Sequence, residues 1–163
     1  MNWYVLQVRT GEEVAIRNAI ENKIGVKAWV PRRTVCERHQ GKIQTVIKTI
    51  LPSYVFTQIN LEPKVYYQLR RISGVIRFLG GNGPEPVPGP EMTYMFKICR
   101  DGELAGLSTL SIGDGIRVLA GPLQGMEGQI VRIDKRKLRA RVRLTLFGQP
   151  HYVDMGLEVL NGT

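Results

Sequence analysis

The sequence contains few of the residues from which catalytic and metal centres are usually built. In 163 residues there are only two cysteines, Cys36 and Cys99, and two histidines, His39 and His151. The cysteines lack CxxC spacing and the histidines complete no metal-ligand set, so packing or surface roles are the default expectation for all four. The chain also has no evident Ser/His/Asp set, no paired carboxylates with a base and no P-loop. We therefore expect neither enzymatic activity nor a cofactor.

Long hydrophobic runs are absent as well. No stretch approaches the roughly 18 consecutive apolar residues of a membrane span. The N-terminus shows no basic leader, apolar core or cleavage site. With 43% hydrophobic and 7% aromatic residues, the composition is typical of a soluble globular protein. We expect a cytoplasmic protein with no membrane partner and one or two small domains.

Negative charge is scarce relative to positive charge. The chain has 23 Lys and Arg residues against 14 Asp and Glu residues, a formal net charge of +9. The first hundred residues hold 15 of the cations and 7 of the anions. The remainder is nearly neutral, but seven of its eight cations lie between Arg132 and Arg143. This polarised patch favours a polyanion such as nucleic acid as a partner.

The segment from residue 112 to 144 combines short β-rich runs with closely spaced glycines, which predicts tight turns between strands. The glycines are Gly113, Gly115, Gly121, Gly125 and Gly128. The last run alternates arginines with apolar residues: Arg139, Arg141 and Arg143 against Ala140, Val142 and Leu144. Alternation of this kind places the arginines on one face of a strand and the apolar side chains on the other. We predict a small β-barrel of about five strands with a basic face.

The first hundred residues predict the element order β, α, β, β, β, α, β, α, which is typical of an α+β sandwich with an antiparallel sheet. The two runs 33–38 and 42–49 predict a hairpin around Gly41. Because this hairpin is polar on both faces, we expect it to project from the body. Residues 101–111 are small and polar and predict a linker.

Several segments together resemble the NusG family of transcription elongation factors. They are WYVLQVRTGEE, LPSYVF, RRISGVIRFLGG, PVPGPEM and GDGIRVLAGPLQGMEGQI. The resemblance implies an NGN domain over residues 1–100, a linker over 101–111, and a five-stranded, SH3-like KOW barrel over 112–163.

The resemblance also implies that the NGN domain binds the β′ clamp helices of RNA polymerase and touches the nontemplate DNA strand. Mapped by motif, the polymerase site comprises Leu51, Pro52, Tyr54 and Phe56. The alternative is that Tyr54 and Phe56 fill the domain core. For the DNA strand the mapped residues are Arg9, Arg70, Arg71 and Ser73, and the alternative is a solvated basic face.

The KOW portion resembles the LoaP group of specialised NusG paralogs, which bind a structured RNA hairpin and act as processive antitermination factors. Leu123 stands where general family members commonly carry a phenylalanine that contacts the ribosome or Rho. The residues predicted to bind RNA are Lys135, Arg136, Lys137, Arg139, Arg141 and Arg143, and Arg117, Arg132 and His151 are predicted to extend this patch. Tyr152 is a candidate for stacking on a base. Two alternatives stay open: a general elongation factor that couples to the ribosome or Rho, and a ribosome-associated RNA-binding protein. A monomer is expected in each case.

Overall fold

The computed structural model describes residues 1–100, 102–113 and 115–159. The chain divides into two compact units. Unit 1 consists of Met1–Val30 and Leu51–Met92, and unit 2 consists of Pro31–Ile50 and Thr93–Thr163. The chain therefore passes between the units three times, so the units do not follow the boundaries at residues 100 and 111 that the resemblance implies. Residue 101 of the expected linker, and residues 114 and 160–163 of the expected KOW domain, lie outside the described residues.

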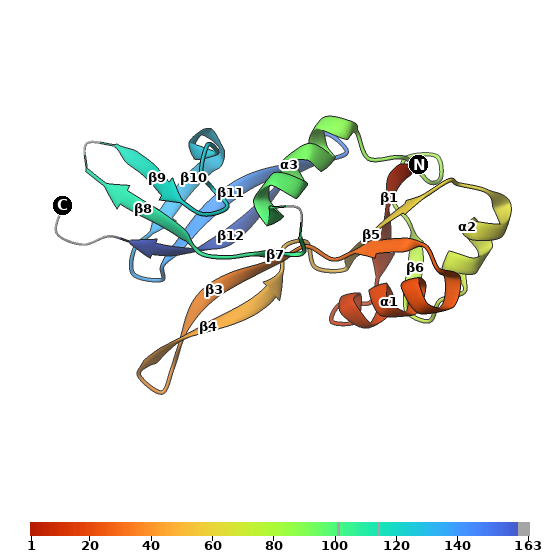
Figure 1. Cartoon of the computed structure of the whole chain (residues 1–163), viewed down its shortest axis with the longest axis horizontal. Coiled ribbons are helices and arrows are strands. Elements are labelled where there is room, and N and C mark those ends of the chain that lie inside the picture. Colours follow the sequence, from red (N-terminus) through yellow and green to blue (C-terminus); the bar gives the residue numbers. More distant parts are fainter. Residues whose placement is uncertain (101, 114, 160–163) are drawn as a thin grey trace. The chain divides into compact units, whose positions relative to one another are not determined.

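Unit 1 is a four-stranded antiparallel sheet with strand order β2-β5-β1-β6, accompanied by helices (Figure 1). Its elements are β1 (Asn2–Val8), α1 (Glu13–Ala19), the π-helix η1 (Ile20–Ile24), β2 (Lys27–Trp29), β5 (Tyr54–Ile59), α2 (Pro63–Arg70) and β6 (Val75–Phe78). The core joins Ile16, Ile20 and Leu69 of the helices to Leu6 and Val55 of the sheet. The predicted α+β class with an antiparallel sheet is confirmed.

The ends of the helices in unit 1 follow local sequence signals. Gly25 ends η1 in the left-handed conformation, with φ 79°, which glycine adopts without steric cost. Pro63 occupies the first turn of α2, where its missing N–H costs no hydrogen bond. The sequence predicts one continuous helix up to residue 24, whereas the chain changes from α-helix to π-helix at Ile20.

Unit 2 contains a curled five-stranded sheet with strand order β10-β11-β12-β8-β9, which fits the predicted small barrel (Figure 1). Its strands are β8 (Ser108–Ile112), β9 (Ile116–Ala120), β10 (Ile130–Asp134), β11 (Arg139–Leu146) and β12 (Gln149–Val159), and a 3-10 turn, η2 (Glu127–Gln129), precedes β10. β12 pairs in parallel with β8, and the other pairs are antiparallel. Helix α3 (Gly89–Cys99) begins in unit 1 and continues into unit 2. None of the helices in the described part of the chain is long and apolar enough to cross a membrane.

The segment expected to be a linker contains regular structure. β7 (Leu104–Ala105) pairs in parallel with β3, and β8 begins at Ser108, before the expected barrel boundary at residue 112. Ser108 is buried, and its hydroxyl accepts a hydrogen bond from the Leu123 amide. A Cβ at Gly121 would lie 2.5 Å from the Cα of Ser108. Small residues are therefore required here for close packing, although the same composition is typical of linkers.

The hairpin is formed by β3 (Arg32–His39) and β4 (Lys42–Thr49), as the sequence predicts. The tip of the hairpin extends away from the other strands, while its base belongs to unit 2 (Figure 1). β3 pairs with β7, and its Val35 is fully buried. A Cβ at Gly156 of β12 would lie 2.0 Å from the carbonyl oxygen of Thr34 in β3. Arg33 and Glu37 of β3 form polar contacts with other parts of unit 2, while the tip at residues 39–45 is exposed.

We predict that Gly156→Ala destabilises the chain and loosens the hairpin, because the added methyl group cannot fit beside the Thr34 carbonyl. The free energy of unfolding, measured by urea denaturation, should fall by about 2 kcal/mol or more. Gly128→Ala is the control, since a Cβ at Gly128 meets nothing within 4 Å. Equal effects of the two substitutions would contradict the close approach of β12 to β3.

Candidate nucleic-acid interface

The predicted alternation in β11 is present. Ala140, Val142 and Leu144 are buried, whereas Arg141 and Arg143 are exposed. In an antiparallel sheet, residues directly opposite each other share a face. Arg132, Arg141 and Asp154 form one such row across β10, β11 and β12, and Arg143 lies opposite Tyr152. We call the surface formed by Arg132, Arg141, Arg143, Tyr152 and Asp154 the basic face.

Tyr152 gives the basic face an aromatic surface. Its side chain is 49% exposed, and the guanidinium of Arg141 lies 5.6 Å from the ring centroid. This cation–π contact limits the freedom of the Arg141 side chain while leaving both groups at the surface. Arginine beside an exposed aromatic ring can bind phosphate and stack on an unpaired base at the same place.

The basic turn consists of Lys135, Arg136 and Lys137, which are all exposed. Asp134 orders it, because its Oδ1 accepts a hydrogen bond of 3.0 Å from the Lys137 backbone N–H. This hydrogen bond holds the pKa of the Asp134 carboxyl below its usual range, so the carboxyl is ionised at neutral pH. The turn therefore has a defined backbone while its three cationic side chains stay at the surface.

A basin of about 70 Å³ connects the basic turn to the basic face. Its lining residues are Arg132, Asp134, Lys137, Arg139, Arg141 and Asp154. Four cations and two carboxylates meet there, so positive charge predominates. The structure thus brings together predicted RNA-binding residues from two strands and the turn between them.

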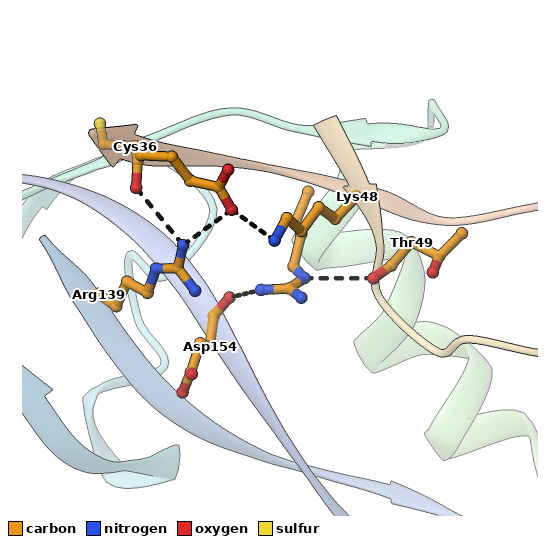
Figure 2. A network of polar contacts seen from close by, with 7 residues as sticks. Cys36, Lys48, Thr49, Arg139 and Asp154 are labelled. Atoms are coloured by element: carbon orange, nitrogen blue, oxygen red, sulfur yellow. Dashed lines mark hydrogen bonds and ion pairs between the residues drawn. The ribbon is translucent and has the colours of Figure 1, made fainter. Parts of the chain in front are cut away.

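Arg139 differs from the other arginines of β11 because its side chain is only 21% exposed. Figure 2 shows its guanidinium directed at the carbonyl of Cys36, and its Nη2 also lies 3.4 Å from the Glu37 carboxylate. Its Nε is buried and has no hydrogen-bond partner among the described residues. Arg139 therefore joins β11 to the hairpin and has little surface left for RNA.

The same network contains three further polar contacts (Figure 2). Lys48 lies 2.5 Å from the Glu37 carboxylate, which lowers the pKa of Glu37 through a hydrogen bond. Arg33 donates to the carbonyl oxygens of Thr49 and Asp154. Burial and the nearby Arg139 guanidinium lower the pKa of Arg33. These contacts could not be predicted from local sequence, because Arg33 and Asp154 are 121 residues apart.

His151 and Arg117 do not lie on the basic face. His151 is opposite Leu144, a buried residue, so its ring is directed to the other side of β12 from Tyr152. Burial lowers the pKa of His151 from 6.5, so the imidazole is mostly neutral at pH 7. Arg117 is exposed on β9, three strands from β11 in the sheet order. Neither residue extends the patch as the sequence suggested.

Leu123 is fully buried, and its amide donates to Ser108. The resemblance implies that general family members have an interface phenylalanine at this position. In this chain the residue at this position belongs to the core instead.

In unit 1, the candidate polymerase residues differ strongly in exposure. Phe56 is fully buried and makes an edge contact with Trp29, at 5.4 Å between ring centroids. Tyr54 is partly exposed and lies in a row with Gln7 and Arg77, which are joined by a hydrogen bond of 2.8 Å. Of the two aromatic candidates, Tyr54 is the one that presents surface.

The turn before β5 has a strained conformation that a buried carboxylate supports. Ser53 has φ 72°, a left-handed conformation that is costly for a residue with a Cβ. Its amide donates to Glu13, which is 4% exposed and also accepts from the Gly11 amide, each at 2.8 Å. The neighbouring candidates Leu51 and Pro52 are buried and exposed, respectively.

The candidate DNA-contacting residues gather at one edge of unit 1. The Arg9 amide donates to the Gly74 carbonyl, which brings the end of β1 to the loop after α2. Arg70, Arg71 and Ser73 are exposed in and beside that loop. The guanidinium of Arg70 lies 5.9 Å from the ring centroid of Tyr66. These residues form an exposed cationic edge.

Comparisons of the sequence and of the structure with known proteins all find members of the same family. A family model described as "Transcription termination factor nusG" matches residues 1–96. The transcription termination/antitermination protein NusG of Rickettsia typhi is 28% identical over 96% of this chain and 87% of its own length. The protein of the same name from Staphylococcus aureus strain Mu50 is 22% identical over 96% of this chain and 92% of its own.

A solved structure described as "Domain interaction in Thermotoga maritima NusG" shares the fold, with a TM-score of 0.60 and 22% identity. The match covers 95% of this chain and 93% of that one. Proteins of this family are transcription factors and not enzymes. Within the described residues, no group of three His, Cys, Asp or Glu side chains is placed to hold a metal ion.

We predict that His151 makes the chain less stable as the pH falls below 6.5. Its pKa is lowered in the folded chain, so the unfolded chain binds the proton more readily and acid favours unfolding. Urea unfolding of His151→Gln, at pH values on both sides of 6.5, should lack this part of the pH dependence. His39→Gln, at the exposed hairpin tip, is the control and should retain it. Identical pH profiles for the unchanged chain and His151→Gln would refute the assignment.

Proposed function

The chain belongs to the NusG family of transcription termination and antitermination factors, and we propose that it binds RNA polymerase through unit 1 and a structured RNA through unit 2. In this proposal it promotes processive elongation and antitermination in the manner of the LoaP group. Polymerase binding holds the chain beside the emerging transcript, and the RNA hairpin selects the transcript on which it acts.

The observation that carries the RNA half of the proposal is the gathering of exposed Arg141 and Arg143 with Tyr152, next to the basic turn. Cations at this density neutralise phosphates and release counterions. The aromatic ring adds a surface for an unpaired base, which charge alone does not supply. Burial of Leu123 supports a specialised role over coupling to the ribosome or Rho, because the residue at that position offers no side chain to a partner.

The polymerase half of the proposal centres on Tyr54, with Pro52 beside it. A partly exposed aromatic ring next to Gln7 and Arg77 offers apolar area with a polar border, as binding hot spots do. Phe56 and Leu51 are both buried, so in this proposal they position the surface rather than contact the partner. The partner proposed for this surface is the β′ clamp helices of RNA polymerase.

For the nontemplate DNA strand we propose the cationic edge of unit 1. Arg9, Arg70 and Arg71 are exposed there, with Ser73 between the strand end and the helix. Their guanidinium groups can bind phosphates without reading sequence. The RNA and DNA contacts thus use separate surfaces on separate units.

We predict that replacing Lys135, Arg136 and Lys137 together by glutamine greatly weakens RNA binding by the full chain and leaves polymerase binding intact. The slope of log affinity against log salt should become shallower by roughly two to three units, about one for each lost phosphate contact. Fluorescence anisotropy with RNA stem-loops at several salt concentrations measures both quantities. Duplex DNA and heparin serve as competitors.

The matched control removes the same charge elsewhere, by replacing the exposed Lys23, Lys64 and Lys97 with glutamine. It should change the RNA affinity much less. Two results would show that the basic turn contributes only nonspecific charge. One is a similar loss of RNA affinity in both triple variants, and the other is equal affinity of the unchanged chain for stem-loops, duplex DNA and heparin.

We predict that Tyr54→Ala weakens association with RNA polymerase by about tenfold or more without loss of thermal stability, as expected for an exposed interface aromatic. Phe56→Ala should weaken it too, but together with a loss of about 3–5 kcal/mol in folding free energy, because it leaves a cavity. Tyr67→Ala is the control, since Tyr67 is 58% exposed on α2. Unchanged polymerase binding by Tyr54→Ala, measured by biolayer interferometry, would exclude this surface.

A further inference from the structure

A groove of about 530 Å³ separates the hairpin from the basic turn within unit 2. One side is lined by Arg38, His39 and Ile43 of the hairpin, and the other by Arg136, Lys137 and Leu138 of the turn. The Arg139–Glu37 contact also lies among the lining residues. We call this feature the hairpin groove. Its volume falls within the range of about 300–1,000 Å³ that is typical of ligand-binding pockets.

The groove combines positive charge with apolar surface. Arg38, Arg136 and Lys137 bring three cations to it. The one carboxylate of the lining, Glu37, is already engaged by Arg139 and Lys48. Ile43 is 56% exposed, so it presents a large aliphatic side chain at the surface of the groove. The groove therefore suits a ligand that is apolar in its middle and negatively charged at its edges.

We propose that the hairpin groove receives an unpaired base of the bound RNA, with Ile43 and Leu138 against the base and Arg38 and Lys137 at the flanking phosphates. This inference rests on the RNA-binding function proposed above and assigns it a second surface, supplied by the hairpin. The partner it identifies is RNA with an unpaired nucleotide in a loop or bulge. A base has an apolar π-face and charged phosphates on either side, so it matches both properties of the groove.

A paired duplex does not match the groove as well. The bases of a duplex are stacked inside the helix, and a duplex could present only its backbone to the rim. Ile43 would then gain no contact, and the cations alone would account for binding. A peptide of acidic residues alone, such as polyglutamate, would match the cations, but it has no flat apolar group between its carboxylates. The apolar contact that each candidate occupant can make with Ile43 therefore distinguishes these occupants.

The test compares two isoleucines of β4 that share a strand face and have nearly the same exposure. Ile43 lines the groove and is 56% exposed, while Ile47 lies outside it and is 54% exposed. Ile43→Asp and Ile47→Asp in the full chain change charge and polarity equally. The probes are a pool of RNA stem-loops with a fixed stem and a randomised loop, and the blunt duplex of that stem.

We expect Ile43→Asp to weaken stem-loop binding roughly tenfold relative to Ile47→Asp, as loss of a base contact predicts. Duplex binding should be the same for both variants. Ile43→Phe, which offers a larger stacking surface, should bind stem-loops more tightly than the unchanged chain, an effect that a merely structural role would not produce. Arg38→Gln should weaken stem-loop binding more than Lys23→Gln does.

Equal stem-loop affinities for Ile43→Asp and Ile47→Asp would overturn the inference, as would displacement of the stem-loops by polyglutamate at equal charge. The proposed function fails in a different way. If the triple glutamine variant of the basic turn still binds stem-loops normally, the RNA-binding surface itself is misassigned. If that variant fails to bind but the two isoleucine variants behave alike, the basic turn stands and only the hairpin groove is wrong.

Discussion

Unit 2 depends on the close approach of β12 to β3, where the Thr34 carbonyl leaves no room for a side chain at residue 156. Polar contacts on both sides of this point hold the two strands in place. Arg33 donates to the Asp154 carbonyl, and Arg139 reaches the Glu37 carboxylate. Together they attach a hairpin from the first third of the chain to a barrel built from the last third. Because the hairpin is held there, its tip and the basic turn line a common groove.

This constraint divides the cations of unit 2 by role. Arg33 and Arg139 are largely enclosed and hold the hairpin to the barrel. Arg141 lies over Tyr152 on the basic face, and the basic turn is ordered by Asp134. A net charge of +9 would favour any polyanion. Selectivity has to come from the apolar groups among the charges, which are Tyr152 on the face and Ile43 in the groove. We therefore attribute affinity to the cations and the choice of RNA to these two side chains.

Features that depend on local pattern could be predicted from the sequence. The predicted alternation of exposed and buried residues in β11 is correct, because strand geometry alone determines it. The α+β class follows from the predicted order of the elements. Features that depend on distant partners could not. In the sequence pattern Arg139 and Arg141 are equivalent, since both lie on the same face of β11. Only the fold shows that Glu37, about a hundred residues away, contacts Arg139. The side of β12 on which His151 lies depends on the strand register, which the sequence does not specify. Residues 101–111 resemble a linker in composition, but their small residues pack in β7 and β8. Phe56 and Tyr54 share a strand face, but the sequence could not show that only Tyr54 reaches the surface.

The proposed RNA-binding surface of unit 2 includes both the hairpin and the barrel. Ultraviolet cross-linking of the full chain to RNA stem-loops, with the cross-linked peptides mapped by mass spectrometry, tests it most directly. We expect cross-links in the hairpin tip, between Arg38 and Ile43, and also in the segment from Lys135 to Arg143. Cross-links confined to the barrel segment, with the hairpin peptides unmodified, would contradict it.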